Sequence, residues 1–101
     1  MTVDKDGLAA ALAALKPEIR QMLAEDLPLD RKSAEDAFIA GRWEQLREQV
    51  HRVKGSASFC RLEALREACL EVEQSVAAGG PPDHATMARF SAEVTRVLAA
   101  L

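Results

Sequence analysis

The sequence predicts an all-α protein, an antiparallel up-down four-helix bundle with an additional N-terminal helix. Apolar residues recur at spacings of three and four in five segments, the periodicity of helices that bury one face. β-branched residues are scattered and no segment alternates apolar and polar residues, so strands are not expected. Short connections favour antiparallel neighbours. At 101 residues, we expect residues 1–101 to form a single domain.

The N-terminal part is predicted to contain two helices before the first interruption. Residues 4–15 are rich in Ala and Leu and are expected to form the additional helix, with Asp4 or Asp6 near its start. Pro17 suits the first turn of a helix, so the bundle, residues 17–101, is expected to begin there. We expect this second helix to reach about Asp26.

A short link is predicted next, because Pro28 lacks the N–H that a helix interior needs. Residues 27–29 would form this link, and Asp30 or Ser33 would cap the helix that follows. Gly41 is expected to end that helix, since glycine readily adopts the left-handed conformation found after helix ends.

The C-terminal half is predicted to hold the remaining helices, over about residues 43–58 and 61–78 and from Asp83 or Thr86 onward. The Gly-Gly-Pro-Pro run at residues 79–82 is the clearest break in the chain. The side chains expected in the core of these helices are Leu46, Val50, Val53, Leu62, Leu65, Cys69, Val72, Phe90 and Val94.

Charge and composition exclude several classes of function. The net charge of −3 argues against nucleic-acid binding, and no apolar run is long enough for membrane insertion. No signal peptide is evident, so a cytoplasmic location is expected. Cys60 and Cys69 are expected to be reduced thiols, and no metal site is expected because the Cys and His spacings match no zinc motif. His84 is expected to be exposed and to have no functional role.

His51 faces away from the core in the predicted helix 43–58. At about 100° per residue it lies about 120° from the middle of the apolar stripe, so it faces solvent or a partner. The stripe comprises Trp43, Leu46, Val50, Val53 and Ala57. The residues that share the side of His51 are Arg47, Lys54, Gly55 and Ser58.

Gly55 is the unusual member of this group, because glycine costs a helix interior about 1 kcal/mol relative to alanine. One interpretation is that its missing side chain clears space over His51, one turn earlier, for a large partner. The other is that it permits close packing of a neighbouring helix.

The run HRVKGSA at residues 51–57 carries a family resemblance. With Val72-Glu73 one helix later, it resembles the signature of histidine-containing phosphotransfer (HPt) domains of bacterial two-component phosphorelays. That signature reads His-x-Leu-Lys-Gly-Ser/Ala-Ala/Ser, followed by Leu-Glu, and Val53 takes the place of the first leucine. The resemblance covers about residues 17–101. It departs at Arg61, where the family often has a glycine, and this concerns how the histidine helix ends.

The resemblance implies a relay of phosphoryl groups between receiver-domain aspartates. His51 would be the phosphoacceptor, and its Nε2 would attack an aspartyl phosphate to form a phosphoramidate. Lys54 would offset the charge of the phosphoryl oxygens, and Gly55 would let the receiver close over the ring. The partners would be receiver domains of a hybrid sensor kinase or a response regulator. The chain would need no cofactor of its own, since the receiver would bring Mg²⁺, and it would not use ATP.

Further residues extend this expected site. Arg47 is a candidate second cation, and Ser58 is expected in the docking surface together with the helix that begins at Pro17. Glu48 lies one turn before the histidine and is a candidate to orient its ring, although its charge would repel a phosphoryl group. We therefore expect Glu48 to be a solvated carboxylate. Gln74 is a candidate donor to the phosphate.

Two other functions fit parts of the sequence. An HPt-like helical interaction module would dock a partner without phosphotransfer. A phosphoacceptor hairpin of a histidine kinase would dimerise, but its histidine is typically followed by an acidic residue and then a proline. Here Arg52 follows and the next proline is Pro81, so we expect a monomer. A free protein and a C-terminal module of a membrane-bound hybrid kinase both fit the sequence, which leaves the partner, the signal and the direction of phosphate flow open.

Overall fold

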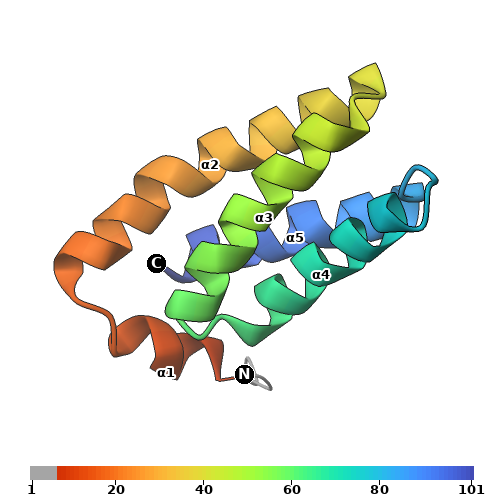
Figure 1. Cartoon of the computed structure of the whole chain (residues 1–101). Helices are drawn as coiled ribbons and strands as arrows, with labels where there is room; N and C mark the ends of the chain where they lie inside the picture. The colour runs from red at the N-terminus through yellow and green to blue at the C-terminus, as the bar shows by residue number, and fades with distance from the viewer. Residues whose placement is uncertain (1–6) are drawn as a thin grey trace.

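The computed structural model describes residues 7–101, and all regular structure in this part of the chain is helical (Figure 1). Helices α2 to α5 form an antiparallel ring in which α2 and α4 each contact both α3 and α5. The short α1 contacts α5 and lies at the end of the bundle where α3 finishes. The predicted helical bundle with an additional N-terminal helix is confirmed. The helices are α1 (Leu8–Ala13), α2 (Pro17–Ala40), α3 (Trp43–Phe59), α4 (Glu63–Ala77) and α5 (His84–Ala100).

The core lies inside this ring and is mainly aliphatic, as expected from a sequence with 4 % aromatic residues. Every side chain predicted to be in the core of the C-terminal half is buried, with at most 2 % exposure. Trp43, expected in the same stripe, is only partly buried and packs against Phe38, with ring centroids 6.0 Å apart. Packing of these apolar faces, and not local propensity alone, therefore determines which side of each helix faces solvent.

The predicted interruption at Pro28 is wrong, because α2 continues through it from Pro17 to Ala40. Proline removes one helical hydrogen bond, but a buried stripe runs along α2 on both sides of it, and burying that stripe outweighs the loss. Asp30 and Ser33 therefore lie within α2 and do not cap a helix. Asp30 instead accepts a hydrogen bond from Gln49 of α3 at 3.0 Å. The buried stripe consists of Leu23, Leu27, Ala34 and Ala37.

The ends of α2 and α3 close in the same way, each with a left-handed residue after the helix. Gly41 ends α2 with φ 71°, as predicted. Arg61 follows α3 with φ 59°, a conformation that costs a residue with a side chain about 1–2 kcal/mol. In this turn the N–H of Leu62 donates to the carbonyl of Ala57 at 2.8 Å, so the backbone closes in the usual manner of a helix end. Arg61, at the position where the family that the sequence resembles often has a glycine, thus adopts a backbone conformation that glycine favours. Helix α4 begins at Glu63.

The start of α5 follows the predicted signal, whereas α1 is shorter than the helix predicted over residues 4–15. Asp83 caps α5, because its carboxylate accepts a hydrogen bond from the N–H of Thr86 at 2.8 Å, and this bond lowers the pKa of Asp83. In the N-terminal helix, α1 begins after Gly7, whereas the expected starts at Asp4 and Asp6 lie outside the described residues. No helix over residues 7–101 is both long and apolar enough to cross a membrane.

Candidate functional site

His51 lies in the middle of α3 and projects from the outer side of the bundle, with 61 % of its side chain exposed. The core stripe of α3 turns inward, and this places the imidazole in solvent, as the helical periodicity predicted. His51 is therefore accessible to a macromolecular partner.

Glu73 of α4 is the hydrogen-bond partner of this histidine. Its Oε2 lies 3.2 Å from Nδ1 of His51, and its side chain is 15 % exposed. An ionised carboxylate only accepts hydrogen bonds, so this contact requires the proton of the neutral imidazole to lie on Nδ1. The lone pair of the neutral ring then lies on Nε2, where it is available as a nucleophile.

Lys54 shares the same carboxylate. Its Nζ lies 2.9 Å from Oε1 of Glu73, and its side chain is 24 % exposed. Oε1 of Glu73 is fully buried, and the ammonium of Lys54 forms an ion pair with it but no hydrogen bond of suitable geometry. One carboxylate from α4 thus contacts both the imidazole and the ammonium of α3, one turn apart, and the cation balances the charge of this largely buried group.

Gly55 faces open space. A Cβ placed on this residue would meet no atom within 4 Å beyond its own helix. Close packing of a neighbouring helix therefore does not explain the glycine, and the interpretation that it clears the surface beside His51 keeps its support. His51, Lys54 and Gly55 lie together within one turn of α3.

The other residues predicted to surround His51 differ in their contacts and in their exposure. Arg47 points away from the histidine, because its Nη2 lies 2.6 Å from Oε1 of Glu44, one turn toward the start of α3. Ser58 is exposed two turns beyond His51. Glu48 is exposed, in keeping with the expected solvated carboxylate, and Gln74 is exposed on α4.

Sequence reasoning placed Glu73 in the signature but did not give it a role beside the histidine. The acidic residue considered for that role was Glu48, which is nearer in sequence. The contact that forms comes from the neighbouring helix, so only the pairing of α3 with α4 reveals it. The sequence feature that could have indicated this contact was Val72. Because Val72 is buried on α4, the next residue, Glu73, lies toward the edge of the α3–α4 interface.

The other candidate nucleophiles are buried or lie elsewhere. Cys60 and Cys69 are both buried free thiols. Burial raises the pKa of Cys69 to about 12, with a further increase from the charge of Glu73, and burial also raises the pKa of Cys60. His84 is exposed as expected, but it is not without contacts: its ring packs edge-on against Phe38, with centroids 5.5 Å apart.

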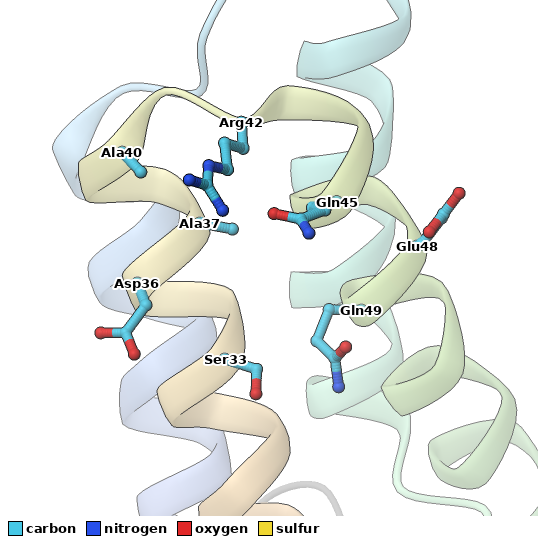
Figure 2. Close-up of a pocket in the computed structure, with 8 residues that line it drawn as sticks. All are labelled: Ser33, Asp36, Ala37, Ala40, Arg42, Gln45, Glu48 and Gln49. Carbon is cyan, nitrogen blue, oxygen red and sulfur yellow. The ribbon is translucent and has the colours of Figure 1, made fainter.

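A groove on α2 and α3 is separate from His51. It has a volume of about 510 Å³ and lies between the end of α2 and the start of α3, where the side chain of Arg42 points into it (Figure 2). Its lining residues are Ser33, Asp36, Ala37, Ala40, Arg42, Gln45, Glu48 and Gln49. His51, Lys54 and Gly55 do not line this groove, and His51 is exposed on the outer side of the bundle.

Comparison with known families adds one match. A family model described as "Hpt domain" matches residues 18–100, which includes every residue of the site described above. Searches of curated proteins and of solved structures found no match.

Proposed function

Because the chain belongs to the Hpt domain family, whose members carry out phosphotransfer in phosphorelays, we propose that it relays a phosphoryl group between receiver-domain aspartates through a phosphohistidine at His51. The observation that carries this proposal is the exposed imidazole whose Nδ1 lies 3.2 Å from Oε2 of Glu73. That arrangement presents the Nε2 lone pair to an approaching receiver.

In the proposed step, Nε2 of His51 attacks the phosphorus of a receiver's aspartyl phosphate. An N–P bond forms while the P–O bond to the aspartate breaks, and the aspartate leaves as a carboxylate with the electron pair. The imidazole keeps its Nδ1 proton, so the ring gains positive charge as the bond forms. Glu73 lies 3.2 Å from this nitrogen and stabilises the developing charge. Donation to the next receiver reverses these bond changes.

Lys54 supplies positive charge beside the transferred group. It lies one helical turn from His51, where its ammonium can approach the phosphoryl oxygens while it remains near Glu73. Arg47 makes a smaller contribution in this proposal, since Glu44 already pairs with its guanidinium. The two cations therefore have unequal roles despite similar spacing from the histidine.

The proposed docking surface surrounds His51, Lys54, Gly55 and Ser58 and extends to the start of α2. Its partners are receiver domains of a hybrid sensor kinase or a response regulator. The chain brings no metal or ATP chemistry of its own in this proposal, and Mg²⁺ belongs to the receiver. We further propose that the chain acts in the cytoplasm. We also propose that it is a monomer, because α2 to α5 close the ring of helices within one chain.

A labelling experiment tests this function. Receivers carrying a radiolabelled aspartyl phosphate are incubated with the chain and with its His51→Gln and His84→Gln variants. We expect acid-labile, base-stable label on the wild type and on the His84 variant, and none on the His51 variant. A wild-type chain that binds the receiver but takes no label would instead be an HPt-like interaction module.

A further inference from the structure

We propose that Phe59, with the apolar groove beside it, is the anchor by which a phosphorylated receiver docks on this chain. The inference rests on the proposed phosphotransfer at His51 and adds a residue that determines affinity for the partner. Neither the signature nor the chemistry at the imidazole involves this residue.

Phe59 is the last residue of α3, and 74 % of it is exposed. It lies eight residues after His51, which is about 12 Å along the helix and about 80° around it. Gly55 lies between them, near the line that joins the two on the helix surface, and adds no side chain. A partner that covers the imidazole therefore meets an unobstructed path to the aromatic ring.

A groove of about 440 Å³ adjoins Phe59, where α1 and the start of α2 meet the end of α3 (Figure 1). Most of the residues that line it are apolar, and two cations, Lys16 and Arg61, also line it. The apolar residues that line it are Ala11, Ala14, Leu15, Ile19, Phe59 and Cys60. An apolar groove that also carries positive charge fits a partner with an apolar contact next to an acidic site.

A phosphorylated receiver has that chemistry, because its aspartyl phosphate must reach His51 while the surrounding surface makes contact. A standard interface covers about 800 Å² per partner, which corresponds to a roughly circular patch of about 16 Å radius. A patch of this size centred on His51 includes Phe59. Lys16 and Arg61 place positive charge beside Phe59, and Lys54 places positive charge beside His51.

Ile39, another exposed apolar residue, lacks this continuity. Ile39 is 82 % exposed but lies in the last turn of α2, at the opposite end of the bundle from Phe59 (Figure 1). It borders a different groove, between α2 and α5. Ile39 is therefore a matched control: a large exposed apolar side chain whose removal leaves the proposed docking surface intact.

The test compares the Phe59→Ala and Ile39→Ala variants with the wild type in two reactions, transfer from a phosphorylated receiver and direct phosphorylation by phosphoramidate. We expect Phe59→Ala to raise KM for the receiver at least about tenfold with kcat little changed, as for an interface anchor. Direct phosphorylation of His51, which needs no docking, should be unchanged. Ile39→Ala should match the wild type in both reactions.

The outcomes separate this inference from the proposed function. If the wild type takes phosphate from phosphoramidate but from no receiver, the proposed relay function fails. If the wild type is active with receivers and Phe59→Ala has the same KM, the anchor is wrong while the relay function stands. A wild-type dimer that Phe59→Ala dissociates, seen by sedimentation, would identify the groove as a contact between copies and would also overturn the anchor. A Lys16→Glu, Arg61→Glu variant should raise the same KM, and an unchanged value would contradict the charge argument.

Discussion

Replacing Gly55 tests two effects independently, the stability of the fold and the access of a partner to His51. Gly55 is inside α3, and an added Cβ meets no atom within 4 Å beyond its own helix. Substitution by alanine should therefore stabilise the fold by about 1 kcal/mol, the difference in helix propensity, and glutamine should have nearly the same effect. For a domain of this size 1 kcal/mol raises Tm by about 4–8 °C.

The same substitutions should impair transfer. The Cα–Cβ bond of a helical residue tilts toward the N-terminus, so a side chain at position 55 leans over the turn that carries His51. Glutamine is long enough to reach the imidazole, whereas alanine adds one methyl group. We expect transfer from a phosphorylated receiver to fall at least about tenfold for Gly55→Gln, and less for Gly55→Ala, because even a misplacement of about 1 Å can cost about 100-fold.

The assay pairs thermal unfolding with single-turnover transfer. Gly80→Ala is the matched control, because Gly80 has an ordinary φ and open space but lies between α4 and α5. Its substitution should stabilise the chain by about 0.4–1 kcal/mol without changing transfer. A Gly55→Gln variant that is stabilised and transfers at the wild-type rate would refute the access argument. A destabilised variant would refute the open-space argument.

Three further predictions concern Glu73, the thiols and the cap of α5. Glu73→Ala should lower the transfer rate about fivefold, since a partly exposed hydrogen bond contributes about 1 kcal/mol. In this variant ¹⁵N NMR should show that His51 shifts from the Nδ1–H form to mixed tautomers. Glu73→Gln should keep the Nδ1–H form. Cys60 and Cys69 should resist a thiol reagent at pH 8 in the native state and react upon unfolding, because burial raises both pKa values; rapid native labelling would contradict their burial. The lowered pKa of Asp83 means that its charged cap stabilises the fold above the unfolded-state value, near pH 4, and that this stability is lost as pH falls through the folded value. Asp83→Asn caps without charge, so its unfolding curves should depend less on pH below 4 than those of the wild type.

Much of the fold follows from the sequence because each helix buries a continuous apolar stripe. The exposure of His51 follows from the same periodicity, since the stripe of α3 leaves the histidine on the outer side. Gly41 and Asp83 mark helix ends through local conformational preferences that need no tertiary information. Pro28 is the exception, because the burial that holds α2 together comes from residues on either side of it packing against other helices.

Residues whose role depends on contacts between helices were harder to predict. Glu73 contacts His51 and Lys54 across the α3–α4 interface, and no spacing within α3 reveals this. Phe59 lies beside a groove that α1 and α2 complete, so its position next to apolar walls appears only in the folded chain. Local periodicity predicted the proposed nucleophile, whereas the positioning group and the docking anchor that we propose depend on tertiary packing.

The most direct test of the relay is the chemical identity of the phosphorylated atom. A ¹⁵N-labelled chain is charged by a phosphorylated receiver and examined by ³¹P and ¹⁵N NMR. We expect one phosphoramidate, on Nε2 of His51, with the proton retained on Nδ1 next to Glu73. Phosphate on Nδ1 of His51 or on His84, or a chain that stays unphosphorylated while the receiver loses its phosphate to water, would contradict the proposed relay.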